Sequence, residues 1–176
     1  MRMKRDLLLW QAAGFAATAV GGTLLHFLYA WSGKSPWVAP FAAVNESTWE
    51  HMKLLYFPLV LFAVVQSLFW GDVPHFWWVK LAGTAVGLWL IPALFYLYNG
   101  AVGPSPDWLN ISFFFLSAAG VFLLEWHLFG QGGHATGHPR LPQAILLGIG
   151  VLFAVFTYMA PHLPLFRDPL TGQYGI

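Results

Sequence analysis

Long apolar stretches separated by short polar turns dominate this chain. A helix that crosses a lipid bilayer needs roughly 20 mainly apolar residues, and five segments approach or exceed that length: Asp6–Ala30, Glu46–Trp70, Phe76–Tyr98, Leu109–Phe129 and Gln143–Ala160. The alternating pattern of a barrel does not appear, and lipid cannot satisfy an exposed backbone. The pattern therefore predicts an all-α, polytopic membrane helix bundle of about five transmembrane helices, forming one domain over residues 1–176.

The connections between these stretches are rich in turn residues. Gly71–Pro74, Asn99–Pro106 and Gly130–Pro142 read as loops because glycine, proline and asparagine recur in them. The segment Trp31–Val44 is too polar and too interrupted by proline to span, so we expect it to lie at the interface or to cap the bundle. Residues 161–176 contain prolines, glycines and apolar residues, which predicts a turn folded over the same face.

Two kinds of residue inside the apolar stretches affect packing. Pro58 and Pro92 each remove a backbone donor within a predicted helix, which favours a kink. The pattern Gly83-x-x-x-Gly87 allows another helix to approach closely. Both features are typical of ordinary contact between helices.

Composition narrows the classes of protein further. The chain is 58% hydrophobic, above the roughly 45–50% apolar usage of soluble domains, and only 9% charged. Its net charge of +1 gives no electrostatic case for nucleic acid. The absence of cysteine excludes disulfides, thiolate nucleophiles and zinc–thiolate sites. Membrane lipids are the first expected partner.

The basic start of the chain bears on topology. The apolar stretch Leu7–Ala30 is longer than a signal-peptide core of roughly 7–15 residues, so we expect it to remain as the first span. Loops rich in Lys and Arg favour the cytoplasm. With the N-terminus inside, the inner side holds Arg2, Lys4, Arg5, Lys80 and Arg140, and the outer side holds Lys34, Lys53 and Arg167. Five against three predicts a multi-pass protein of the plasma (inner) membrane with a cytoplasmic N-terminus.

A polar cluster, Asn45–Lys53, stands at the start of the second span. Three of the fifteen charges of the chain lie in it, namely Glu46, Glu50 and Lys53. Glu46 and Glu50 are four residues apart and are expected to share one helix face, with Lys53 near that face and His51 turned away by about 100°. Ionisable groups at such a boundary are costly to bury, so they usually have a partner or a function. Two neighbouring carboxylates can bind a cation or share a proton.

Other polar residues are expected at the same level of the membrane. His26 ends the first span, and Asn110, His162 and Asp168 lie in parts of the chain predicted on that side. The candidate ligand-binding residues are His26, Glu46, Glu50, His51, Lys53, His162 and Asp168. The competing interpretation is structural: Ser47-x-x-Glu50 matches a capping box, and Glu50 with Lys53 is then an ordinary ion pair.

Polar residues on the inner side give weaker signals. Glu125 and His127 diverge by about 200° on a helix, which favours two side chains that reach separately toward the interface. His134 and His138 lie in a glycine-flanked stretch that predicts a solvated loop. The chain contains no H-E-x-x-H pattern, nucleophile elbow or phosphate loop, and nothing in it selects a cofactor, a metal or a catalytic residue.

With these residues in view, the chain resembles a family of small prokaryotic integral membrane proteins of unknown function. The resemblance rests on three stretches, His26–Gly33, Asn45–Lys53 with its pattern N-E-S-x-W-E-H-x-K, and Pro164–Ile176. It implies no activity. A weaker resemblance, to the tryptophan-rich sensory or translocator proteins, rests on helix count, length, tryptophan content and the segment Lys34–Pro40.

Three functions compete on these residues. The first is binding or transport of a small molecule or cation at the outer Glu/His cluster. The second is a membrane enzyme that uses His26, Glu50 and His51 as acid, base or metal ligands on a lipid-like substrate. The third is an accessory subunit of a larger membrane complex, or a homo-oligomer. A binder should show a pocket that ends at the carboxylates, and a metalloenzyme should bring at least three of the candidate ligands within metal-ligand distance. A subunit should show neither, with its cluster occupied by caps and ion pairs.

Overall fold

The computed structural model describes residues 2–73, 75–131 and 138–176, with side chains from residue 5 onward. Five long helices make up most of it: α1 (Arg2–Trp31), α2 (Thr48–Trp70), α3 (Phe76–Ala101), α4 (Asp107–Gly130) and α5 (Arg140–Tyr158), followed by a short 3-10 turn, η1 (Pro164–Phe166). Each of the five is long and apolar enough to cross a membrane. The prediction of an all-α bundle with five transmembrane helices is confirmed.

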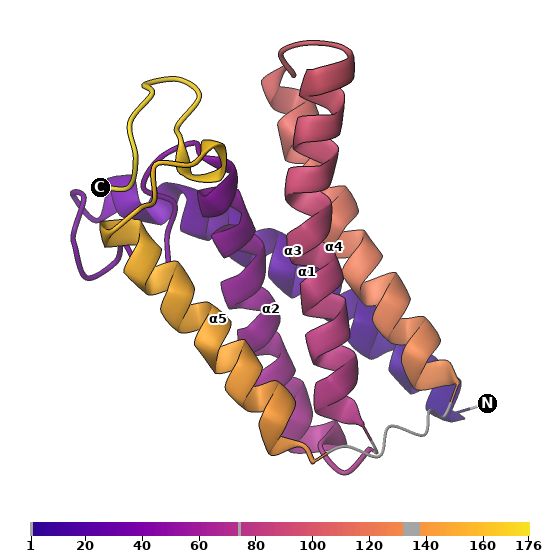
Figure 1. The fold of residues 1–176 in the computed structure, drawn as a ribbon. Coiled ribbons are helices and arrows are strands. Elements are labelled where there is room, and N and C mark those ends of the chain that lie inside the picture. The colour runs from indigo at the N-terminus through magenta and orange to yellow at the C-terminus, as the bar shows by residue number, and fades with distance from the viewer. Residues whose placement is uncertain (1, 74, 132–137) are drawn as a thin grey trace.

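The helices run between two ends of the molecule that differ in their connections (Figure 1). The N-terminus and the start of α5 lie at one end, together with the α2–α3 connection; we call it the N-terminal end. The end of α1, the start of α2, the end of α5 and the C-terminus lie at the other, which we call the cap end. Within the bundle, α3 packs against α4, and α1 lies beside both α2 and α4.

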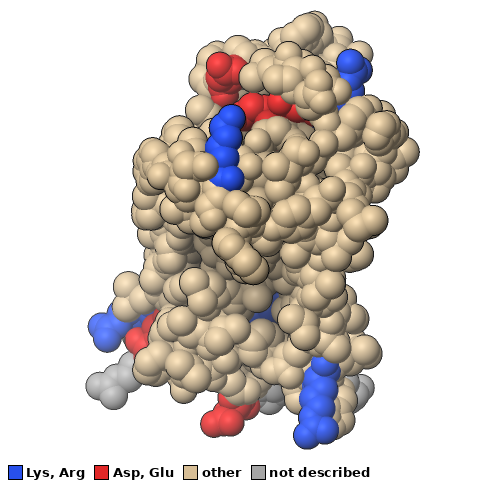
Figure 2. All heavy atoms as spheres, turned by 90° about the vertical axis from the view of Figure 1, so that its left-hand side faces the viewer, with Lys and Arg blue, Asp and Glu red and all other residues tan. Residues whose placement is uncertain are grey.

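The outer surface has the charge distribution of a membrane protein. Charged side chains gather at the two ends of the face shown in Figure 2, and the band between them is almost entirely uncharged. Trp31, Trp37 and Trp108 are 66%, 87% and 67% exposed. Tryptophan favours the headgroup level of a bilayer, so these rings are suited to anchor the cap end there.

Small residues allow α3 and α4 to pack closely. A Cβ at Gly87 would lie 2.4 Å from Val121, so only glycine permits this approach. The packing role predicted for the Gly83-x-x-x-Gly87 pattern is confirmed. Pro58 and Pro92 both lie inside helices, as predicted.

Helix boundaries differ from the predicted ones where capping decides them. Ser47 has an extended backbone, and its Oγ accepts the Glu50 N–H at 3.4 Å, so α2 begins at Thr48 and not at Glu46. The expectation that Glu46 and Glu50 share a helix face is wrong, because Glu46 precedes the helix. At the other end of the bundle α5 begins at Arg140 and not at Gln143, since Pro142 fits a first helical turn.

The cap end is closed by the segment between α1 and α2 and by the C-terminal tail. The Trp49 ring lies 4.5 Å from Phe153 of α5 and 4.7 Å from Phe166 of the tail, measured between ring centroids. The Ile176 N–H donates to the Thr157 carbonyl at 3.2 Å. The prediction that the tail folds over this end is confirmed.

Candidate functional site

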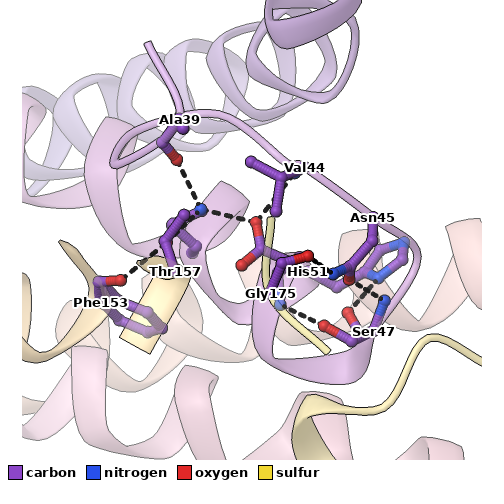
Figure 3. A network of polar contacts seen from close by, with 10 residues as sticks. Ala39, Val44, Asn45, Ser47, His51, Phe153, Thr157 and Gly175 are labelled. Carbon is purple, nitrogen blue, oxygen red and sulfur yellow. Dashed lines mark hydrogen bonds and ion pairs between the residues drawn. The ribbon is translucent and has the colours of Figure 1, made fainter. Parts of the chain in front are cut away.

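Glu50 and Lys53 form a buried ion pair at the start of α2. Lys53 Nζ lies 2.6 Å from Glu50 Oε2, and the two side chains are 0% and 2% exposed. The ammonium also donates to the Ala39 carbonyl at 2.8 Å and to Thr157 Oγ1 at 2.9 Å. Glu50 Oε2 in turn accepts the Val44 N–H at 3.0 Å. Figure 3 shows how Ala39, Val44 and Thr157 converge on the pair.

This network joins three parts of the chain that are distant in sequence. Ala39 and Val44 belong to the segment between α1 and α2, and Thr157 belongs to the last turn of α5. All three protons of the Lys53 ammonium have an acceptor, which is the condition for burying a charge without a large penalty. We call Glu50, Lys53 and Thr157 the clamp, because together they connect the segment between α1 and α2 to the helices of the bundle.

The predicted capping box is only half formed. Ser47 caps Glu50, but the Glu50 carboxylate accepts from Val44 and not from the Ser47 N–H. Asn45 Oδ1 accepts that N–H at 2.9 Å, and its Nδ2 donates to the Gly175 carbonyl at 3.0 Å. Asn45 therefore fixes the backbone before α2 and also ties the C-terminal tail to it.

A second group, separate from the clamp, consists of His26, Glu46 and His51. Glu46 Oε1 lies 3.7 Å from His26 Nε2, and Glu46 Oε2 lies 3.6 Å from His51 Nε2. The ligand atoms of the three residues all lie within 4.8 Å of one another. Their side chains are 29%, 42% and 26% exposed, so solvent reaches the group.

A backbone contact orients His51. Its Nδ1 lies 3.0 Å from the Ser47 carbonyl, which can only accept, so Nδ1 carries the proton. In the neutral ring Nε2 is then the atom with the free lone pair, and this atom faces Glu46. A ligating histidine is held in the same way by a carbonyl or carboxylate on its other nitrogen.

The spacing of the three residues fits a shared cation better than direct hydrogen bonds. The two N···O distances exceed the roughly 2.7–3.2 Å of a hydrogen bond. The two histidines approach different oxygens of Glu46, and one ligand atom from each of the three residues lies within 4.8 Å of the others, a spacing compatible with a shared cation. Two imidazole nitrogens and one carboxylate form a donor set typical of Zn²⁺.

The remaining predicted site residues lie in the C-terminal tail and have other partners. Asp168 is buried, and its carboxylate accepts from the Leu170 N–H at 2.9 Å and from Thr171 Oγ1 at 2.7 Å. His162 is exposed and stacks on Tyr174 with ring centroids 4.5 Å apart. Asn110 is in the first turn of α4, where its Oδ1 accepts from Ser105 Oγ of the α3–α4 connection at 2.6 Å. None of these contacts joins them to His26, Glu46 or His51.

A second buried ion pair lies toward the N-terminal end. Lys80 Nζ of α3 is 2.5 Å from Glu125 Oε2 of α4, and the side chains are 2% and 0% exposed. The expectation that Glu125 reaches toward the interface is wrong, because burial between two helices brings it to Lys80. Lys80 and Lys53 are both buried within helices of the bundle, so neither counts among the loop charges that indicate topology.

Sequence reasoning could have found this pair. Lys80 lies four residues after the start of α3, and Glu125 lies five residues before the end of α4. Opposite charges at matching depth in adjacent spans are expected to pair. His127, by contrast, is exposed, and its Nε2 lies 2.8 Å from Gln131 Nε2. Of the two predicted loop histidines, His138 is exposed and His134 falls outside the described residues.

Comparisons with known proteins place the chain in a family without assigning an activity. Neither the curated proteins nor the solved structures give a match, so the weaker resemblance to the tryptophan-rich sensory proteins gains no support. A family model described as a family of unknown function, DUF6512, matches residues 1–176. The resemblance to an uncharacterised family of membrane proteins is thereby confirmed, and the chain belongs to the DUF6512 family.

Proposed function

We propose that this protein binds a divalent transition-metal ion, with Zn²⁺ the best fit, through His26, Glu46 and His51 at the cap end of the bundle. The observation that carries the proposal is the convergence of three ligand atoms within 4.8 Å. The orientation of His51 by the Ser47 carbonyl supports it, since the lone pair is already directed toward Glu46.

The number of ligands favours an exchangeable ion. Structural zinc sites use four protein ligands, whereas sites with three keep a position open for water or substrate. All three side chains here are partly exposed. Uptake, carriage or delivery of the ion fits this arrangement better than a purely structural role.

The clamp helps to choose among the three candidate functions. Glu50 Oε2 is paired with Lys53 and accepts the Val44 N–H, which disfavours an enzyme that uses Glu50 as acid or base. An accessory subunit should have the whole polar cluster occupied by caps and ion pairs. His26, Glu46 and His51 are not occupied in that way, and this favours binding.

The proposal includes an orientation. Removing the two buried lysines from the earlier comparison leaves Arg2, Lys4, Arg5 and Arg140 against Lys34 and Arg167, which is four against two. The N-terminal end then faces the cytoplasm, and the metal site faces the outside of the plasma membrane.

Zinc binding by the purified protein tests the proposal. The protein is freed of metal with a chelator in detergent or nanodiscs, and Zn²⁺ is titrated against a competing chromophoric chelator. We expect one ion per chain and a loss of affinity of at least roughly tenfold in H26Q, E46Q and H51Q. H162Q is the matched control, because His162 is an exposed histidine stacked on Tyr174.

Two results would overturn the proposal. One is an absence of stoichiometric binding to the folded wild-type protein. The other is equal affinity in wild type, H51Q and H162Q, which would place the ion elsewhere on the chain.

A further inference from the structure

Four polar side chains from four different helices lie at one level inside the bundle, toward its N-terminal end. They are Gln11 of α1, Gln66 of α2, Lys80 of α3 and Glu125 of α4, and each is at most 5% exposed. We call them the polar layer. They are independent of the proposed metal site, which lies at the cap end.

Aromatic rings place the four residues together. The Phe62 and Phe122 rings are 6.2 Å apart, and each lies 5.8 Å from Lys80 Nζ. A Cβ at Gly14 would meet both rings, so α1 contacts them as well. Gln66 follows Phe62 by four residues, Glu125 follows Phe122 by three, and Gln11 precedes Gly14 by three. Residues three or four apart share a helix face, so each polar residue lies on the same face of its helix as its reference residue. Given the helix directions, each also lies about one turn nearer the N-terminal end.

A second aromatic pair closes the layer on its other side. The Phe76 and Phe129 rings are 5.8 Å apart, and they lie 5.6 and 5.8 Å from Lys80 Nζ. The ammonium therefore sits among four phenylalanine rings with one hydrogen-bonded partner, Glu125 Oε2. Weak cation–π contacts leave its other two N–H groups without an acceptor among the described residues.

The layer contains more hydrogen-bonding groups than it satisfies. Both side-chain polar atoms of Gln11 and of Gln66, and Oε1 of Glu125, are buried and have no partner in the part of the chain that the structure describes. An unpaired polar atom of this kind is costly to bury if it stays dry. The missing partners include donors and acceptors, and water supplies both. Buried water typically makes about three hydrogen bonds to such groups.

We propose that the polar layer is a hydrated internal site, in which water binds among Gln11, Gln66 and Glu125 and lets the Lys80–Glu125 pair exchange protons. The ligand is water, and the transferred species is a proton. Movement of a proton from Lys80 Nζ to Glu125 Oε2 leaves a neutral amine and a neutral acid, so the net charge of the pair stays at zero. Lys80 is the charged group that the described residues place against Glu125.

Solid-state NMR in lipid bilayers tests the hydration. The chain has five glutamines, Gln11, Gln66, Gln131, Gln143 and Gln173, so selective ¹⁵N labelling of their side-chain amides gives five resolvable signals. We expect magnetisation from water protons to reach Gln11 and Gln66 at rates close to that of the exposed Gln143. Transfer no faster than to the backbone amide of the buried Val121 would overturn the proposal, as would a direct contact that pairs Gln11 with Gln66.

The double variant K80M/E125L shows whether the ion pair holds the water. Removing both charges together avoids leaving one of them buried alone. We expect water transfer to Gln66 to fall to the level of the Val121 amide, with Gln143 unchanged. Unchanged transfer to Gln66 would contradict the role of the pair, and the wild-type measurement stands by itself if the variant does not fold.

Infrared spectroscopy tests the proton exchange. On transfer from H₂O to D₂O we expect the Glu125 carboxylate band to shift within minutes, because the Lys80 N–H groups become N–D. The band is assigned by its absence in K80M/E125L. A band that does not shift over hours would overturn proton exchange at this site. Zinc binding at the cap end is measured separately, so either proposal can fail without the other.

Discussion

Glu46 and Glu50 are four residues apart, yet they belong to different groups because α2 begins between them. Ser47 starts the helix, so Glu50 points into the bundle toward Lys53, while Glu46 stays in the preceding turn beside two histidines. One carboxylate is fully buried and the other is partly exposed. Only the partly exposed one is accessible to an ion from solvent.

Acid should weaken zinc binding by wild-type protein. Imidazole must be free of its proton to ligate a metal, so protons compete with the ion for His26 and His51. We expect a lower affinity in acid than at neutral pH, as measured with the same competing chelator. An affinity that is the same in acid as at neutral pH would exclude histidine ligands.

Loss of the Glu50 carboxylate should destabilise the protein strongly. E50Q leaves the Lys53 ammonium buried without a counter-charge, which costs about 3–5 kcal/mol when a buried pair is broken. We expect a lower midpoint in denaturant or thermal unfolding in detergent. The matched control is E50Q/K53M, which removes both charges and should recover most of the stability. Equal stability of E50Q and wild type would show that the clamp contributes nothing.

At the scale of the helices, the α3–α4 contact combines close approach with a buried charge. Gly87 lets the two helices meet, whereas Gly83 makes room for a carboxylate: a Cβ there would lie 2.9 Å from both Cγ and Oε1 of Glu125. Lys80 holds that carboxylate in place, so it cannot easily move aside. The small-residue pattern thus serves helix packing at one position and the ion pair at the other.

Replacing Gly83 with alanine should therefore be costly although the change is small. We expect G83A to lose about 1–3 kcal/mol of stability, the usual cost of an overpacked core, measured by unfolding in detergent. G148A is the control, since a Cβ at Gly148 of α5 meets nothing within 4 Å. It should be neutral, or more stable by up to about 1 kcal/mol. Similar stability of G83A and G148A would contradict the tight fit around Glu125.

At the scale of the whole molecule, the cap end is a small assembly of segments from both halves of the chain. Trp49 of α2 packs against α5 and the tail, and Asn45 is hydrogen-bonded to Gly175. Glu46 and His51 lie within two residues of these anchors. The packing of the tail thus helps to fix the turn that carries the proposed metal ligands.

Removing the Trp49 ring should release the tail. Without the surface on which Phe166 packs, we expect W49A to be cleaved by trypsin after the exposed Arg167 many times faster than wild type, because cleavage requires local opening. W108A is the matched control, since Trp108 is exposed. Mass spectrometry of the released peptide gives the rate. Equal rates in W49A and W108A would show that Trp49 does not hold the tail.

The sequence predicted the helices well because bilayer thickness fixes their length and composition. It also grouped His26, Glu46 and His51 at one level of the membrane. It could not show the clamp, since Lys53 is held by a loop carbonyl at Ala39 and by a side chain 104 residues away. The division of Glu46 from Glu50 depended on one cap residue, and a shift of two residues in a helix start changes which side chains share a face.

The clamp also bears on how the chain enters the membrane. Helices are synthesised in order, so α2 can reach the bilayer while α5 is still unmade. During that interval the Lys53 ammonium lacks Thr157, the acceptor that α5 supplies. Glu50 and the Ala39 carbonyl remain as partners, and we expect water to take the third position at the head of α2. On this basis, insertion of the fifth helix completes the burial of the lysine.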